Sequence, residues 1–392
     1  MIFNIVVKEP LPDGARLSMG CNRNSWNPNE EGWTAQKIDD THYRLEKDLP
    51  CPARLEYKWT LQRTLQSNVW NYVESCENGQ ELVNRVAEVV DGTESFHDVV
   101  VRFRNTGNRS TVTRGTLVGV DLKMAQYGNG SLRRIRIWLP DGYDPGDASV
   151  RYPVLYMHDG QNLFDSYTSY LGEWELDESM GRIMDSGCQG AIIVGIDNSG
   201  EERYSELSPP WPLSAVGRKY ISHPYGDRYS AFVTDTVRNY VNDHYNTRTS
   251  PRYTGIGGSS MGGAISFYMA VTYPGVYGYA LVFSPSLQVF EEGAVQRYVR
   301  RLGTCRCRVQ PALYLYSGGT RRDGDEDTPY DEACIRGKLE SLYECLLDCG
   351  YPKERLALCV DECRSHSEAA WAGQFTAAYR WLSQTVMDSE TM

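Results

Sequence analysis

Residues 253–267, YTGIGGSSMGGAISF, decide the fold class of this chain. A short apolar run leads into a glycine-rich turn, and an apolar helical pattern follows at once. Within the turn, Gly258, Ser260 and Gly262 fit G-x-S-x-G, in which a sharp strand-to-helix turn needs small neighbours so that one hydroxyl stands above the sheet. The pattern therefore predicts a strand, a nucleophile elbow and a helix, with Ser260 as a candidate catalytic nucleophile.

Two other interpretations of the same glycines stay open at this point. The turn could be a tight glycine-lined connection without a chemical role. The run from Gly255 to Ser260 also approaches the dinucleotide-binding pattern G-x-G-x-x-G, but a serine stands at the third glycine, and the unit lies in the middle of its domain. Because no P-loop lysine follows either, we expect no nucleotide cofactor and no other cofactor here.

The chain around this turn alternates strands and helices from about residue 116 onward. The expected strands are 135–139, 154–157, 191–196, 253–256, 279–283, 312–316 and 355–360, with helical patterns at 229–245, 261–272 and 331–347. Nearly continuous apolar strands of this kind are buried on both faces by covering helices. The alternation predicts a doubly wound α/β domain of the α/β-hydrolase type over residues 116–392.

The first part of the chain has a different pattern. Short β-type runs at 3–7, 16–21, 42–45, 55–59 and 96–103 are separated by Gly, Pro and Asn. Such spacing is typical of a small antiparallel β-sandwich of the immunoglobulin-like kind. We therefore expect one all-β domain over 1–106 and a polar linker over 107–115, which places two domains in a chain of 392 residues.

The position of one histidine supports the nucleophile assignment. Hydrolases of this architecture order their catalytic groups along the chain as nucleophile, acid and histidine. Of six histidines only His366 follows Ser260, and it comes directly after the last expected strand. The acid that orients the imidazole should follow the strand 312–316. That loop offers Asp323, nearest the strand, and Asp325 as the alternative.

An oxyanion hole requires two backbone amides near the nucleophile. One comes from the residue after the nucleophile, Met261, and the other from a loop after an earlier strand. The strand 154–157 runs into His158-Asp-Gly-Gln-Asn, where Gly160 permits a close turn and Gln161 can present its amide. We expect His158 to be a packed side chain and not a metal ligand.

Charge and hydropathy exclude several classes of protein. The net charge is −11, from 40 basic and 51 acidic side chains, and nucleic-acid binding rests on clustered Lys and Arg, so we expect no nucleic-acid partner. No run of 18 apolar residues is present, and the first residues lack the features of a signal peptide. We therefore expect a cytoplasmic protein without a membrane partner.

The 11 cysteines crowd toward the C-terminal part of the chain. Seven of them occupy positions 305, 307, 334, 345, 349, 359 and 363. Their spacings are C-x-C and C-x3-C, which lack the paired C-x2-C knuckles of a zinc site. The sequence therefore predicts free thiols and no metal, and it assigns this crowding no function.

Several stretches in their order along the chain resemble the Putative esterase family, the esterase D-like group of α/β-hydrolases that includes enterochelin, feruloyl and acetyl-xylan esterases. The matching stretches begin at Leu139 (LPDGYD), Tyr152 (YPVLYMHDGQNLFD), Gly172 (GEWELD), Val194 (VGIDN), Gly258 (GSSMGG), Phe283 (FSPS) and His366 (HSEAAW). The resemblance implies that Ser260 and His366 are nucleophile and base, and that Gln161 and Met261 form the oxyanion hole. Family members often carry the acid two residues after Gly-Thr, where this chain has Arg322.

The first domain resembles a carbohydrate-binding module of the starch-binding type. The resemblance rests on the stretches around Asn24 (NSWNP), Leu55 (LEYKW) and Trp70 (WNYVE). It implies that Trp26 and Trp70 stack on sugar rings while Lys58 bonds the hydroxyls, because aromatic faces suit such stacking. Where well-studied members have a second tryptophan before Glu-Ser, this chain has Val73. An α-glucan is the expected partner, with an accessory domain that has lost sugar binding as the alternative.

Together these observations predict a serine carboxylesterase that acts on an acyl ester, carried by a carbohydrate or related small molecule, through an acyl-enzyme on Ser260. Two alternatives remain open. An acyltransferase would use the same triad with a sugar hydroxyl in place of water. An inactive hydrolase would serve as a glycan-binding or scaffold protein.

Overall fold

A computed structural model describes residues 1–11, 15–62, 69–76, 82–104, 110–128, 130–169, 172–302, 310–319 and 332–387. The chain divides into two compact units. The first comprises residues 1–111 together with 165–172, and the second comprises 112–164 and 173–392. The N-terminal unit thus includes a short segment from later in the chain.

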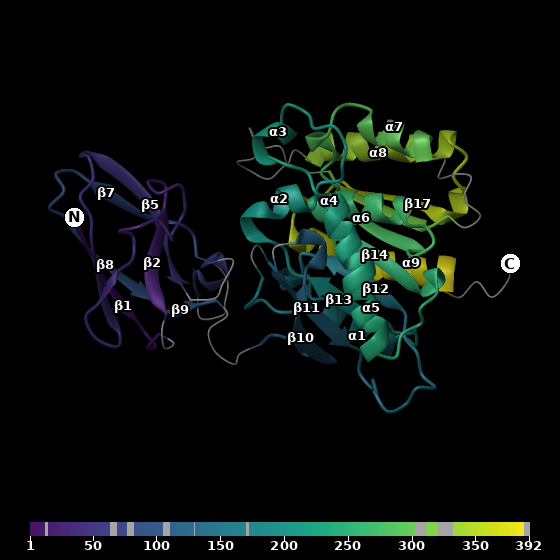
Figure 1. The fold of residues 1–392 in the computed structure, drawn as a ribbon, viewed down its shortest axis with the longest axis horizontal. Helices are drawn as coiled ribbons and strands as arrows, with labels where there is room; N and C mark the ends of the chain where they lie inside the picture. The colour runs from purple at the N-terminus through teal and green to yellow at the C-terminus, as the bar shows by residue number, and fades with distance from the viewer. Residues whose placement is uncertain are drawn as a thin grey trace. The chain divides into compact units, whose positions relative to one another are not determined.

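The N-terminal unit is all-β, as the turn-punctuated strands predicted (Figure 1). Its strands are β1 (Ile2–Val7), β2 (Arg16–Cys21), β3 (Gln36–Lys37), β4 (His42–Glu46), β5 (Ala53–Gln62), β6 (Glu74–Ser75), β7 (Arg85–Val89), β8 (Ser95–Val100) and β9 (Arg102–Phe103). They form sheets of order β3-β4-β1-β8 and β2-β5-β7, with β6 paired to β9. Strands β1 and β8 pair in parallel, so the expectation of a purely antiparallel sandwich is wrong at this pair. Alternate residues of β1 face inward, and Phe3 packs edge-on against Trp59 of the other sheet in a shared apolar core.

The second unit is built on an eight-stranded sheet with the order β10-β11-β13-β12-β14-β15-β16-β17. Its strands are β10 (Thr116–Lys123), β11 (Leu132–Leu139), β12 (Val154–His158), β13 (Ile192–Ile196), β14 (Thr254–Ser259), β15 (Tyr279–Phe283), β16 (Ala312–Gly318) and β17 (Leu356–Asp361). Strands β12 to β17 are parallel, and β10 and β11 are antiparallel additions at one edge. This mixed α/β sheet confirms the predicted fold class.

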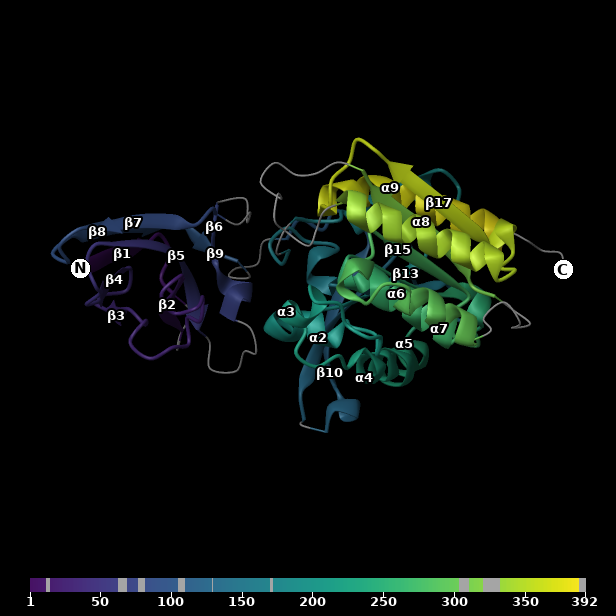
Figure 2. The ribbon, with the colours of Figure 1, turned by 90° about the horizontal axis from the view of Figure 1, so that it is seen from above.

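Helices cover both faces of this sheet (Figure 1). They are α1 (Leu176–Asp185), α2 (Arg203–Glu206), α3 (Gly217–Tyr220), α4 (Gly226–Ala231), α5 (Arg238–His244), α6 (Met261–Thr272), α7 (Ala294–Leu302), α8 (Glu332–Asp348) and α9 (Glu368–Leu382). The helical pattern expected at 229–245 is formed by α4 and α5, joined by a π-helical stretch, Phe232–Val237. In Figure 2, α8 lies between β17 and α7, and it contacts both.

The two faces of the sheet have separate apolar cores. Successive residues of a strand point to opposite faces, and on β16 Leu313 and Leu315 join one core while Tyr314 and Tyr316 join the other. The first core contains α6 and α8, and the second contains α1 and α9. A strand buried on both faces has no polar alternation, which is why the sequence showed continuous apolar runs.

The edge strand β10 was not among the expected strands. Its residues are half-buried or exposed along its whole length, so its apolar pattern is weak.

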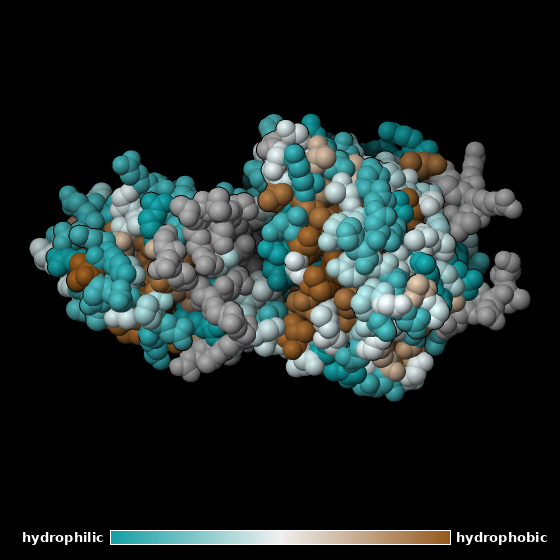
Figure 3. Space-filling view, turned by 60° about the horizontal axis from the view of Figure 1, so that its bottom comes forward, coloured by the Kyte–Doolittle hydropathy of each residue, from teal (hydrophilic) through white to brown (hydrophobic). Residues whose placement is uncertain are grey.

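Figure 3 shows apolar side chains forming a strip on one face of this unit, between largely hydrophilic surroundings. Among the described residues, no helix has both the length and the apolar character needed to span a bilayer.

Candidate active site

The strand order brings the predicted catalytic loops to one edge of the sheet. Strand β14 pairs in parallel with β12 on one side and with β15 on the other. The carboxyl ends of parallel neighbours lie at the same edge, where α/β proteins place their ligands. The loops that follow β12, β14 and β15 therefore meet there, and they carry Gln161, Ser260 and Ser286.

Ser260 occupies the strained turn that the glycine pattern predicted. Its φ is 58° and its ψ is −121°, a conformation that a non-glycine residue rarely adopts. The backbone N–H of Ser260 donates to the carbonyl of Phe283 at 3.0 Å, which ties the turn to β15. A Cβ added to Gly258 would lie 3.0 Å from the Gly262 carbonyl carbon, so the glycines on either side of the serine are required by close packing.

The Ser260 hydroxyl is buried and has a hydrogen-bond partner that the sequence did not suggest. Its Oγ lies 3.0 Å from Oγ of Ser286. The Ser286 backbone N–H also donates to the Ser260 carbonyl at 3.0 Å. Among the described residues the hydrogen bond of the Ser260 side chain thus goes to Ser286 and not to His366. The only sequence signal was the stretch FSPS after β15.

The two residues predicted to form an oxyanion hole, Gln161 and Met261, follow the neighbouring strands β12 and β14. Met261 is the first residue of α6, and the first amides of a helix have no acceptor within the helix. Gln161 lies in a short 3-10 turn, Gly160–Asn162, directly after β12. A Cβ on Gly160 would lie 2.5 Å from the Gly195 carbonyl carbon, so the turn approaches β13 more closely than any other residue would allow.

A buried ion pair fixes the turn that carries Gln161. Asp159 precedes that turn with a left-handed φ of 57°. Its carboxylate accepts two hydrogen bonds from Arg203, at 2.6 and 2.7 Å, and one from Asn198 Nδ2 at 2.7 Å. Burial would raise the pKa of Asp159, but Arg203 and Asn198 outweigh it and hold that pKa below its usual value. Asp159 is therefore a buried anion, and its partners orient the turn Gly160–Asn162, which carries Gln161.

His158 is buried beneath the elbow, as predicted for a packed side chain. A Cβ on Gly258 would lie 3.1 Å from His158 Cδ2, and one on Gly262 would lie 3.2 Å from His158 Cβ. The ring nitrogen Nδ1 is 2.7 Å from the hydroxyl of Tyr229. Burial lowers the pKa of His158 to about 3, so the imidazole is neutral at physiological pH. His158, the last residue of β12, thus packs against Gly258 and Gly262 on either side of Ser260.

His366 lies in the loop between β17 and α9, half-buried. Its ring packs edge-on against Trp371, with centroids 4.9 Å apart and an angle of 88°. The Trp371 indole N–H donates to Oγ of Ser284 at 3.1 Å. Because Ser284 lies two residues before Ser286, one short turn after β15 contacts both Ser260 and the indole that packs on His366. The candidate acids Asp323 and Asp325 lie outside the described residues.

The fold and this edge of the sheet define an ester hydrolase. Residues 129–382 match the family model described as Putative esterase, and the chain belongs to that family. The family places the protein among the carboxylic ester hydrolases.

Individual relatives are distant. The uncharacterized protein YbbA of Bacillus subtilis (strain 168) is 22% identical over 251 residues, which are 64% of this chain and 92% of that protein. Siderophore hydrolase EstA of Aspergillus nidulans superposes with a TM-score of 0.54 at 18% identity, over 69% of this chain and 95% of its own. Ferric enterobactin esterase of Salmonella typhimurium has a TM-score of 0.52 at 14% identity and covers 95% of this chain and 90% of its own. These structural likenesses show the fold.

The three predicted sugar-binding residues lie close together in the N-terminal unit. The rings of Trp26 and Trp70 are half-buried, with centroids 6.1 Å apart. Lys58, which is buried, pairs across the sheet with Gly20. A Cβ on Gly20 would lie 2.4 Å from the Trp70 ring, so the glycine makes room for that indole.

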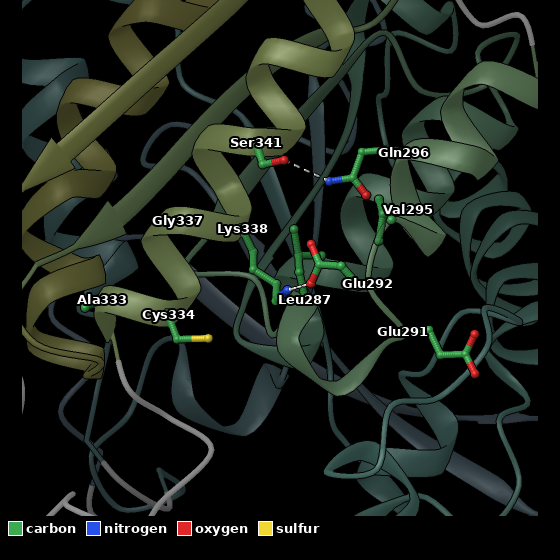
Figure 4. A pocket seen from close by; sticks show the side chains of 11 residues that line it. Leu287, Glu291, Glu292, Val295, Gln296, Ala333, Cys334, Gly337, Lys338 and Ser341 are labelled. Atoms are coloured by element: carbon green, nitrogen blue, oxygen red, sulfur yellow. Dashed lines mark hydrogen bonds and ion pairs between the residues drawn. The ribbon is translucent and has the colours of Figure 1, made fainter.

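A cavity of about 250 Å³ lies between α7 and α8 (Figure 4). Leu287 lines it, one residue beyond Ser286. Lys338 on α8 pairs with Glu292 across it, and Gln296 donates to Ser341 at 3.2 Å. Of the predicted catalytic residues that the structure describes, Ser260 and His366 are not part of its lining.

Three carboxylates gather at the start of α1. The ligand atoms of Glu173, Asp177 and Glu178 lie within 4.8 Å of one another, which makes them the candidate metal-ligating group among the described residues. Asp177 is buried, and its Oδ2 accepts the backbone N–H of Thr113 at 2.8 Å. Burial, and then the neighbouring Asp177, raise the pKa of Glu178 to about 7.

This raised pKa predicts a pH dependence of stability. A carboxyl that binds its proton more tightly in the folded protein stabilises the fold at low pH, and that contribution is lost as the pH rises through the folded-state pKa. We expect the free energy of unfolding to fall by about 1 kcal/mol between pH 5 and 7, a figure reduced for solvent screening. Glu178→Gln should remove this slope in urea titrations. Glu175→Gln, an exposed neighbour, should keep it, and an unchanged slope in Glu178→Gln would contradict the assignment.

Proposed function

We propose that the protein is a serine carboxylesterase in which Ser260 is the nucleophile. The observation that carries the proposal is the backbone of Ser260, a non-glycine residue at φ 58° between a buried strand and a helix. Strain of this kind persists only where the surrounding structure enforces it, and it concentrates at functional sites. The strained turn holds the Ser260 hydroxyl at the carboxyl edge of the sheet, and the loops that carry Gln161 and His366 follow strands of the same sheet.

The mechanism follows from these positions. Ser260 Oγ attacks the ester carbonyl carbon while its proton passes to His366, and a tetrahedral intermediate forms in which the former carbonyl oxygen carries the negative charge. The amides of Gln161 and Met261 bind the oxyanion. His366 then returns the proton to the leaving alcohol, which leaves an acyl-enzyme, and an activated water releases the acid in the second half.

The acid that orients His366 stays a proposal: Asp323, with Asp325 as the alternative. A triad carboxylate keeps the imidazole in the productive tautomer, and its loss lowers turnover by roughly four orders of magnitude in well-studied serine proteases. Comparing Asp323→Asn with Asp325→Asn therefore separates the two residues. If neither variant loses turnover, the acid lies on another loop.

The substrate we propose is an acyl ester of a carbohydrate or a related small molecule. A panel of acetyl, feruloyl and longer acyl esters, together with a siderophore ester, tests the class and ranks the acyl groups by kcat/KM. An acyltransferase on the same site would show faster release of the alcohol when a sugar acceptor is added, with acylated sugar as product. Absence of turnover on the whole panel, with the protein folded, would contradict the proposed activity.

We also propose that the N-terminal unit binds an α-glucan through Trp26, Lys58 and Trp70. The support is the pair of adjacent indoles beside a lysine, with Gly20 making room beneath one ring. A sugar ring stacks on the face of an aromatic side chain, so removal of the indole ring should abolish glucan binding.

In a glycogen pull-down, Trp70→Ala should lose retention by tenfold or more, since a stacked aromatic contributes roughly 1.4 kcal/mol or more to binding. Tyr220→Ala, which removes an exposed aromatic side chain of the hydrolase unit, is the matched control and should be retained like the unaltered protein. Glucan binding at this site would be contradicted if all three proteins were retained equally, or if the unaltered protein were not retained at all.

A further inference from the structure

We infer that Ser286 is a positioning residue of the esterase, whose hydroxyl donates a hydrogen bond to the nucleophile Ser260 and holds it in the reactive rotamer. The inference rests on the proposed function of Ser260 and adds a residue to that site. The triad template assigns no catalytic role to the loop after β15. The role of Ser286 is therefore inferred from a contact in the structure.

Two contacts join the residues. The side-chain oxygens are 3.0 Å apart, and the Ser286 backbone N–H donates to the Ser260 carbonyl at 3.0 Å. Both serines are buried, with 6% of Ser260 and none of Ser286 exposed. Among the described residues, the Ser286 hydroxyl makes its hydrogen bond with Ser260 Oγ. A buried hydroxyl keeps its partner, since losing it costs the desolvation of that group.

The direction of this hydrogen bond follows from the chemistry. Ser260 must donate its own proton to His366 when it attacks, so its Oγ is then an acceptor toward Ser286. As the proton leaves and the Oγ–C bond forms, negative charge develops on Oγ, and a hydrogen bond to a charged acceptor is stronger than a neutral one. Ser286 keeps its proton throughout. The bond is therefore stronger in the transition state than in the ground state, which is the condition for raising kcat.

The turn that carries Ser286 is itself fixed on both sides. Ser284 has a positive φ of 38°, its N–H donates to the Tyr316 carbonyl at 2.7 Å, and its hydroxyl accepts the Trp371 indole. Because Trp371 supports His366, the same turn sets the position of Ser286 relative to the histidine. Pre-organisation of this kind leaves little to rearrange during the reaction.

The test compares the rate of labelling by a fluorophosphonate probe in Ser286→Ala and Ser286→Cys. The alanine removes the donor, and the cysteine keeps the volume but is a weak donor. Both should label at least about tenfold more slowly than the unaltered protein, as expected for one lost hydrogen bond of this strength. On an ester substrate kcat should fall by a similar factor with KM little changed.

Ser230→Ala is the matched control. Ser230 is a fully buried serine whose hydroxyl donates to the Gly226 carbonyl at 2.6 Å, in α4. Its removal should lower stability like that of Ser286 without slowing the labelling. Labelling of Ser286→Cys at the unaltered rate would overturn the inference, even if Ser286→Ala fails to fold. No labelling of the unaltered protein would instead contradict the proposed esterase itself.

Discussion

Ser260→Ala is expected to lower turnover on any ester substrate by roughly 10⁴- to 10⁶-fold while the protein stays folded. The alanine removes the atom that forms the acyl-enzyme, so only binding and the oxyanion amides remain to assist water. The elbow itself should persist, because the Phe283 carbonyl accepts a backbone N–H and not the side chain. The measurement is kcat on the best ester of the panel, with thermal unfolding as the check on folding.

Ser259→Ala is the control for this variant. Ser259 is the preceding residue of the same turn, at the end of β14, and it is about as buried as Ser260. Ser259→Ala removes a hydroxyl one residue before the proposed nucleophile, so its effect on kcat should be smaller by orders of magnitude. Equal losses in the two variants would show that the turn matters only for folding.

Arg203→Met is expected to have the second large effect, on stability and on turnover together. It leaves the buried carboxylate of Asp159 without its bidentate partner, and breaking a buried ion pair in this way costs about 3–5 kcal/mol. Because Asp159 precedes the turn that carries Gln161, the oxyanion amide should also move. The loss of one oxyanion donor lowers kcat by roughly 10²- to 10³-fold.

Arg134→Met supplies the comparison for the ion pair. Arg134 pairs with Asp121 at 2.9 Å, and both side chains are 44% exposed. A pair of this kind contributes at most about 1 kcal/mol, so urea titration should find Arg134→Met close to the unaltered protein. If Arg203→Met were equally stable and equally active, Asp159 would have no part in positioning the turn that carries Gln161.

Most of the fold could be predicted because burial on both faces leaves a clear sequence pattern. Strands such as β13 and β15 consist of apolar residues and glycine throughout, and the glycine turn between β14 and α6 marks a strand-to-helix junction. Strand β10 was missed because it lies at the edge of the sheet, where half-buried residues alternate with exposed ones and no continuous apolar run forms.

The strained turn at Ser260 could be predicted, because the glycine pattern fixes small residues at the junction of β14 and α6. The catalytic roles of Ser260 and His366 stay predictions. Contacts made across the sheet left no such signal. The pairing of Asp159 with Arg203 joins residues 44 positions apart, and the hydroxyl contact between Ser260 and Ser286 joins two loops through the order of β14 and β15. Spacing along the chain cannot show which of many arginines or serines the topology brings to one loop.

The central claim is that Ser260 is an activated nucleophile, and intact-mass measurement after treatment with a fluorophosphonate probe tests it most directly. The probe forms a stable adduct with an activated serine and releases its leaving group. We predict a single adduct on the unaltered protein, located to the peptide that contains Ser260, and no adduct on Ser260→Ala. A folded protein that gains no adduct, or an adduct that persists in Ser260→Ala, would contradict the account.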